Sequence, residues 1–93
     1  MNVDKAKKRI AKQVSKGFNG YPWVSIEYFG ENAELATEVV IQFTLEEGSE
    51  PQEQSFTSKG DVRNDEAIQT VLLKVIERAG ANSVTEKQGV SAR

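Results

Sequence analysis

The side chains of this chain that could do chemistry are carboxylates and bases, because the sequence contains neither histidine nor cysteine. Histidine is the most common general acid–base of enzymes and, with cysteine, supplies most zinc ligands. Nucleophilic catalysis by a Ser-His or Cys-His pair is therefore excluded within one chain. We expect no cofactor, no metal and no disulfide, and we expect that the protein is not an enzyme.

The carboxylates gather in two places. Eight glutamates fall between residues 21 and 57, a segment without lysine or arginine: Glu27, Glu31, Glu34, Glu38, Glu46, Glu47, Glu50 and Glu53. Paired carboxylates can act as acid and base, but several of these fall in a predicted hairpin tip, surrounded by solvent. The second group, Asp61, Asn64, Asp65 and Glu66, lacks the alternate spacing and glycine of a calcium loop and suits the start of a helix. We interpret both groups as surface charge and helix capping.

The bases gather at the start of the chain, although the whole sequence has a net charge of -2 and a pI of about 5.2. In a predicted helix from Val3 to about Ser15, the bases that project away from the apolar stripe are Lys5, Lys8, Arg9, Lys12 and Lys16. Such a face could contact phosphates, which makes a nucleic-acid-binding module the first alternative function. A solvated helix face explains the same side chains, and the acidic segment would repel a polyanion. Nucleic acid is therefore the less favoured partner.

Three stretches between the two ends of the chain have the alternating pattern of β-strands. The longest, residues 37–45, places Val39, Ile41, Phe43 and Leu45 on one face. Residues 23–29 precede it, and a weaker polar stretch at about 52–58 follows it. Pro22 and Pro51 open the first and third stretches, and proline is tolerated at a strand's first residue or on an edge. The pattern predicts a meander with residues 37–45 in the middle.

A second helix is predicted up to Ala79, where apolar residues recur at helical spacing from Ile68 and Gly80 can end the helix. A capping box at Ser58–Asp61 precedes it. We therefore expect an α+β fold of order α-β-β-β-α, in which a three-stranded antiparallel meander carries both helices on one face. Residues 1–80 would form a single domain, and residues 81–93 a tail that is partly disordered or forms one short strand.

The outer side of the predicted sheet is the candidate site. If the apolar face of residues 37–45 packs on the helices, the opposite face gathers Trp23, Glu27, Phe29, Glu38, Val40 and Gln42. A sheet face that is only exposed to solvent does not need a tryptophan and a phenylalanine, and aromatic residues are enriched in protein contacts. We interpret the chain as a small protein-interaction or accessory module that binds through this face or through an edge strand. As an alternative, the tail or residues 18–21 fold over the aromatic side chains.

The partner expected for this face is an unidentified protein with a basic surface, because Glu27 and Glu38 would be brought against their own copies in a face-to-face dimer. We expect a weak homodimer at most. A small-ligand carrier or small enzyme is the second alternative, and it would need an apolar pocket. The chain has no apolar run of the ~18–20 residues that span a bilayer and no apolar core of a secretory signal after its first residues. We expect a cytoplasmic protein without a membrane partner.

Overall fold

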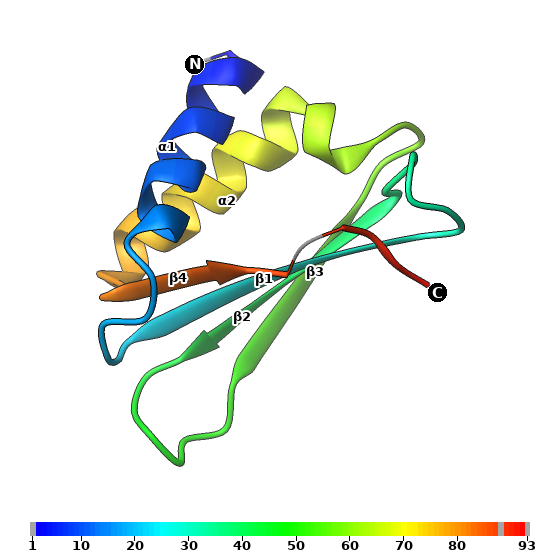
Figure 1. Cartoon of the computed structure of the whole chain (residues 1–93). Coiled ribbons are helices and arrows are strands. Elements are labelled where there is room, and N and C mark those ends of the chain that lie inside the picture. Colours follow the sequence, from blue (N-terminus) through cyan, green and yellow to red (C-terminus); the bar gives the residue numbers. More distant parts are fainter. Residues whose placement is uncertain (1, 88, 93) are drawn as a thin grey trace.

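The computed structural model describes residues 2–87 and 89–92 of the chain. Two helices lie on one side of a mixed β-sheet, and no helix covers the other side within the described residues (Figure 1). The elements in chain order are α1 (Val3–Ser15), β1 (Trp23–Gly30), β2 (Glu38–Thr44), β3 (Gln52–Thr57), the 3-10 turn η1 (Val62–Asn64), α2 (Glu66–Ala79), β4 (Ser83–Glu86) and β5 (Ser91–Ala92). The predicted α+β class is confirmed.

Helix α1 forms where its apolar period and its capping residue coincide. The Asn2 side chain accepts a hydrogen bond from the Lys5 backbone N–H at 2.9 Å, which satisfies one of the free donors at the helix start. Ala6 and Ile10, one turn apart, are buried against the rest of the protein. The other residues of α1 are exposed or half-buried, as expected for a helix with a single apolar stripe.

Helix α2 begins later than the predicted capping box places it. Its N-cap is Asp65, whose carboxylate accepts from the Ile68 backbone N–H at 3.1 Å and from the Ser58 hydroxyl at 3.3 Å. Asp61 instead caps the turn η1. Gly80 ends the helix in the left-handed conformation, as the sequence predicts. The acidic residues at this helix start are thus used in capping, and no group of three or more metal-ligating side chains occurs among the described residues.

Asp61 also ties the loop after β1 to the start of the second helical segment. Its carboxylate accepts from the Arg63 backbone N–H and from Arg63 Nε, both at 2.9 Å, and from the Ala36 backbone N–H at 3.3 Å. The Arg63 hydrogen bonds lower the pKa of Asp61 from 3.8 to about 2. The Val62 backbone N–H then donates to the Ala36 carbonyl at 2.7 Å. Two segments far apart in the sequence are held together by this one carboxylate.

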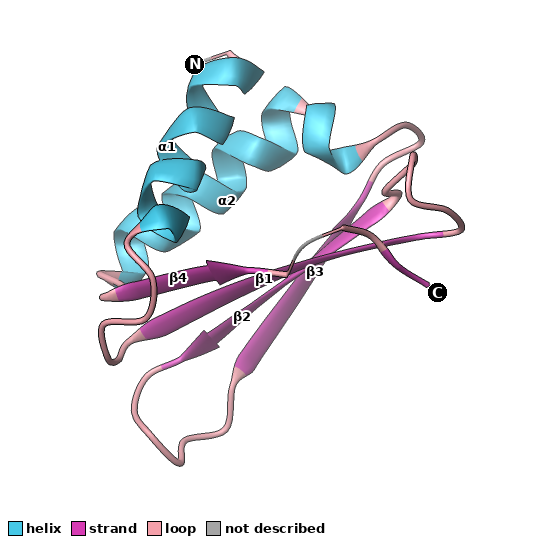
Figure 2. Cartoon of the chain, viewed as in Figure 1, coloured by secondary structure: helices cyan, strands magenta, loops and turns pink. Residues whose placement is uncertain are grey.

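The sheet differs from the predicted three-stranded meander. β1, β2 and β3 pair antiparallel in sequence order, as predicted. However, β4 pairs parallel with β1 from Trp23↔Ser83 to Ile26↔Glu86, and β5 pairs with Phe29 and Gly30 of β1. The result is a five-stranded mixed sheet of order β3-β2-β1-β4, with β5 also on β1 (Figure 2). β1 is therefore an interior strand, and the meander prediction is wrong at this edge.

The extra strands come from the tail, for which the sequence predicts disorder or one short strand. β4 has four residues and only one large apolar side chain, so it is too short to show an alternating pattern. Tertiary contacts compensate for the weak local preference, because Val84 is 1% exposed and belongs to the hydrophobic core. Gln88 and Arg93 of this tail lie outside the described residues.

The core lies between the helices and the inner face of the sheet. Val24, Ile26 and Tyr28 of β1 are buried there with Val39 and Ile41 of β2. The alternation of buried and half-buried residues along β1 shows that one face is covered.

The predicted apolar face of the second strand is wrong at its end. β2 stops at Thr44, and Leu45 lies beyond it with 56% of its surface exposed. Phe43 is only half-buried against the core. Leu45 follows the last residue of β2, so strand pairing no longer holds its side chain on the core face.

Removing the chain after Asn82 is predicted to destabilise the fold. The truncation deletes the parallel strand β4 and exposes core surface that Val84 covers, and burial of one such side chain contributes about 1.5–3 kcal/mol. Urea unfolding should show a lower free energy of unfolding by at least about 2 kcal/mol. The control, a truncation after Lys87, retains β4 and should lose much less. Equal unfolding curves for the full chain and for the chain that ends at Asn82 would contradict the role of β4.

Candidate functional site

The outer face of the sheet, meaning the side away from the helices, gathers the six residues that the sequence predicts. The antiparallel pairing places Glu27 opposite Val40 and Phe29 opposite Glu38, while Trp23 lies at the start of β1 opposite Thr44. Gln42 follows Val40 by two residues and points to the same side. These residues share a face because side chains alternate between the two faces of each strand, and the register between β1 and β2 keeps this alternation in phase.

A shallow depression of about 110 Å³ lies on this outer face. Its lining comes from three strands and consists of Ser25, Glu27, Phe29, Val40, Gln42 and Glu53. Val40 is 6% exposed, and the Gln42 side-chain amide donates to Glu53 Oε2 at 2.9 Å. The depression thus combines apolar surface from Phe29 and Val40 with two carboxylates. Sequence reasoning missed Glu53, because it assigned the third strand no part in the site.

Trp23 belongs to a cluster of three aromatic rings at one end of the outer face. Its ring centroid lies 5.6 Å from that of Phe18 and 6.3 Å from that of Tyr21, and all three contacts among the rings are edge-to-face. Trp23 Nε1 donates to Thr85 Oγ1 of β4 at 2.9 Å. The alternative in which residues 18–21 fold against the aromatic side chains therefore holds at Trp23. Phe18 is the most solvent-exposed of the three, with 55% of its surface accessible.

The tail reaches the outer face at Glu27. Ser91 Oγ donates to Glu27 Oε2 at 2.7 Å, and Lys87 Nζ lies 3.3 Å from the same oxygen. The Lys87 side chain is 65% exposed, so this ion pair is a weak surface contact. Sequence reasoning missed Lys87 and Ser91, since nothing in their local sequence indicates that the tail lies beside β1.

The predicted phosphate-contacting residues lie on the other layer of the protein. Lys5, Lys8, Arg9 and Lys12 are exposed along α1, and Lys16 is its C-cap. α1 lies on the helix side of the sheet, so these bases are separated from the acidic outer face (Figure 1). The bases of α1 and the outer-face acids Glu27, Glu38 and Glu53 thus lie on opposite sides of the sheet.

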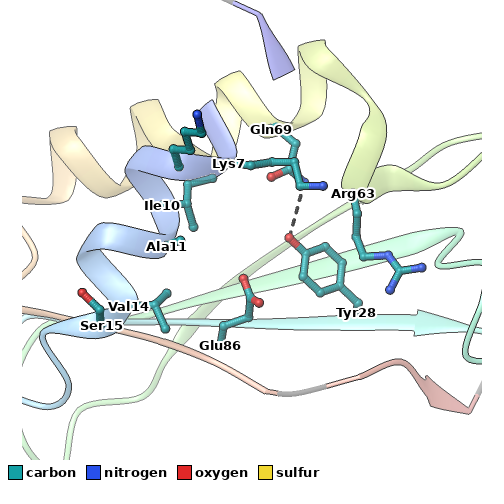
Figure 3. Close-up of a pocket in the computed structure, with 10 residues that line it drawn as sticks. Lys7, Ile10, Ala11, Val14, Ser15, Tyr28, Arg63, Gln69 and Glu86 are labelled. Atoms are coloured by element: carbon teal, nitrogen blue, oxygen red, sulfur yellow. Dashed lines mark hydrogen bonds between the residues drawn. The ribbon is translucent and has the colours of Figure 1, made fainter. Parts of the chain in front are cut away.

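A second concave region, absent from the sequence predictions, is a cleft of about 490 Å³ between α1 and the β1–β4 side of the sheet (Figure 3). The α1 side of its lining combines apolar and polar side chains, and polar groups lie opposite. The lining residues are Lys7, Lys8, Ile10, Ala11, Val14, Ser15, Tyr28, Arg63, Gln69 and Glu86. The sequence does not predict this cleft, because Glu86 belongs to the tail and the strand pattern around Tyr28 predicts only an ordinary core residue.

Opposite α1, the polar groups of the cleft include Tyr28, Gln69 and Glu86. Gln69 is 1% exposed, and its amide donates to the Tyr28 hydroxyl at 3.3 Å and to the Val62 carbonyl at 3.0 Å. Burial raises the pKa of Tyr28, and it also raises the pKa of Glu86, although the charge of Lys7 opposes the second shift. The Glu86 carboxylate has no hydrogen-bond partner among the described residues. It is the only acid in the lining of the cleft.

Comparisons of the chain with models of protein families, with curated proteins and with solved structures found no match. Neither helix in the described part of the chain is long and apolar enough to cross a membrane. The function must therefore be argued from the depression on the outer face, the cleft beside α1 and the surfaces around them.

Replacing Glu86 by glutamine is predicted to stabilise the protein at neutral pH. A carboxyl group whose folded-state pKa is raised favours the fold when it is protonated, and this contribution is lost as pH rises through the folded pKa. At pH 7 Glu86→Gln should therefore melt at a higher temperature than the parent chain. The difference should shrink as pH falls through the raised pKa toward 4.5, the ordinary value for this group, and should be largely gone below it. Glu77→Gln, at an exposed position on α2, is the control that should show no such trend.

Proposed function

We propose that the protein is a non-enzymatic protein-interaction module that binds a basic protein surface through the outer face of its sheet. The observation that carries the proposal is the depression in which Phe29 and Val40 lie beside Glu27 and Glu53. Apolar side chains beside charged ones on a surface are typical of protein contact sites. No helix of the described chain covers this side of the sheet.

Charge indicates what kind of partner fits. Glu27, Glu38 and Glu53 project to the outer side, and the hairpin after β2 adds Glu46 and Glu47 at exposed positions. Complementary charges accelerate association and exclude partners of the same sign. An arginine-rich surface fits best, because guanidinium groups pair with carboxylates in a planar fork and stack on aromatic rings.

The two alternatives have less support. Nucleic-acid binding would use Lys5, Lys8, Arg9, Lys12 and Lys16 of α1. These side chains follow an exposed helix, and of the five only Lys8 is among the described residues that line the cleft. Catalysis on the outer face would need an enclosed site. The depression there is far smaller than the ~300–1,000 Å³ of ordinary ligand pockets.

We expect a hexa-arginine peptide to bind the outer face in an NMR titration of the isotope-labelled protein. The amide shifts should concentrate at the depression and its neighbours in β1, β2 and β3. Glu27→Gln with Glu38→Gln should weaken binding about fivefold, which corresponds to roughly 1 kcal/mol. The matched control, Glu66→Gln with Glu77→Gln, changes the same charge on the exposed surface of α2 and should bind nearly as the parent.

A single-stranded oligonucleotide is the second arm of this titration. It tests the basic residues of α1 at low salt, where phosphate contacts are strongest. Shifts confined to α1 on adding the oligonucleotide, with none on the sheet on adding the peptide, would favour the nucleic-acid alternative. Equal weakening by both pairs of substitutions would show a general charge effect and contradict a site on the outer face.

The cleft favours a second candidate function, the binding of a small apolar molecule that carries an amine. The specific observation is the half-buried Glu86 carboxylate, which has no hydrogen-bond partner in the described part of the chain and lies in the same cleft as Ile10, Ala11 and Val14 (Figure 3). An ammonium group would pair with this carboxylate, while its chain would cover these apolar side chains. Pairing with a charged ligand would offset the desolvation of Glu86.

A series of n-alkylamines from butyl to octyl tests the cleft. Affinity should rise about fourfold with each added methylene, since burial of one contributes about 0.8 kcal/mol. Glu86→Gln should abolish the preference for an amine over the alcohol of the same length, measured by calorimetry. Stronger binding of the matching carboxylates would mean that Lys7 and Lys8 control the cleft, and would rule out an amine site.

A further inference from the structure

The strand β3 forms one margin of the sheet and is open along its outer edge. It pairs with β2 on one side only, and no strand of the described chain lies on its other side. Its register with β2 is continuous from Glu38↔Thr57 to Phe43↔Gln52, so it contains no bulge. It also contains no lysine and no internal proline. β3 thus lacks the devices by which edge strands avoid pairing with other chains. The opposite margin, β4, is shorter and is followed by Lys87.

The hydrogen bonds of the sheet determine which groups of β3 point to the open side. The Ser58 backbone N–H donates to the Thr37 carbonyl at 3.0 Å, in line with the β2–β3 register. Residues of an antiparallel pair alternate in direction, so residues 52, 54 and 56 bond to β2. Glu53, Ser55 and Thr57 therefore direct their N–H and C=O groups away from β2.

The hydrogen bonds between β1 and β4, at the opposite margin of the sheet, independently predict the same direction for the backbone groups of β3. Lys87 N–H donates to the Ile26 carbonyl at 2.9 Å and Ser83 N–H to the Pro22 carbonyl at 3.3 Å. Even-numbered residues of β1 thus face β4, and odd-numbered residues face β2. Through the register Glu27↔Val40, the even-numbered residues of β2 face β1 and the odd-numbered residues face β3. Both margins of the sheet lead to the same assignment for β3.

We propose that β3 pairs antiparallel with β3 of a second copy of this chain, on a two-fold axis at Ser55. In this register Ser55 lies opposite its own copy, and Glu53 lies opposite Thr57 of the other copy at both ends. All three outward-facing residues of each strand are then paired. Alternation implies six backbone hydrogen bonds between the copies. This inference is independent of the proposed function, because it uses the edge of the sheet and not its outer face.

Neighbouring registers are poorer. A shift that places Glu53 opposite its own copy brings two carboxylates together, which destabilises a strand pair. A shift that places Glu53 opposite Ser55 sets Thr57 opposite Pro51, which has no N–H to donate. A shift that places Ser55 opposite Thr57 sets Glu53 opposite Lys59, beyond the end of the strand at Thr57, and a shift that centres the pair on Thr57 runs still farther past it. Self-complementarity therefore selects the Ser55 register, and it argues for a second copy as the occupant.

Side chains on both faces suit this pairing. On the outer side, the Thr57 hydroxyl can donate to the Glu53 carboxylate of the other copy. On the helix side, half-buried Phe56 would lie opposite Gln54 of the other copy. A groove of about 420 Å³ runs there beside β3, between Phe43 and Val75. The second strand would extend the sheet at this groove and cover apolar surface that the helices leave open.

Engineered thiols test the register, because the chain has no cysteine of its own. Opposed residues of a hydrogen-bonded pair have Cα atoms about 5.5 Å apart, within the ~4.4–6.8 Å that a disulfide spans. Ser55→Cys should therefore form a covalent dimer under mild oxidation. Glu53→Cys alone and Thr57→Cys alone place their thiols four residues from their own copies, roughly 13 Å, and should stay monomeric. A mixture of those two variants should cross-link.

Backbone substitution supplies a second measurement that needs no thiol. Ser55→Pro removes an outward N–H, which an edge strand tolerates, so the variant should keep its melting temperature but sediment as a monomer where the parent sediments as a dimer. The control Gln54→Pro removes an N–H directed at β2 and should lower the melting temperature. Binding of the arginine peptide to the outer face should persist in Ser55→Pro.

Three results would overturn the proposal. The first is a parent chain that stays monomeric at all concentrations. The second is cross-linking of Glu53→Cys alone as efficiently as Ser55→Cys. The third is a Ser55→Pro variant that still dimerises.

Discussion

The structure depends on the hydrogen bonds that β1 makes along both of its edges. Its odd-numbered residues bond to β2 and its even-numbered residues to β4, so the strand joins the antiparallel half of the sheet to the parallel half. Its inner side chains, Val24, Ile26 and Tyr28, are buried beneath the helices. A strand buried on one face and paired on both edges has little freedom to slip, because a shift of one residue would exchange its two faces.

Both concave regions follow from this arrangement. On the outer side, β1 and β2 bring apolar and acidic residues together around Val40. On the inner side, β4 stays paired only as far as Ile26↔Glu86, and β5 resumes pairing at Phe29↔Ser91. The cleft lies on this inner side, where Tyr28 of β1 and Glu86 at the end of β4 both line it.

The small size of the chain explains why so much of the sheet is available for contacts. A domain of this length buries a limited share of its surface, and its apolar residues suffice for one core between one helical layer and one sheet face. The outer face and the β3 edge remain without a covering layer in the described chain. Pairing at the β3 edge would join the outer faces of two copies into one continuous acidic surface. Such a surface would present the proposed binding face twice, on the same side of one sheet.

The sequence by itself determined the elements whose signals are local: α1, α2 and the three antiparallel strands. It also determined that Trp23, Glu27, Phe29, Glu38, Val40 and Gln42 share a face, because period two along a strand needs no tertiary information. Only the tertiary structure decided that residues 83–86 pair with β1, since four residues with a single large apolar side chain carry too weak a local preference. The same holds for Leu45, which has an apolar period but no partner to bury it. The cleft between α1 and β4 could not be predicted from local sequence either. Lys7 and Glu86, which both line it, are nearly 80 positions apart, and only the packing of the tail brings them together.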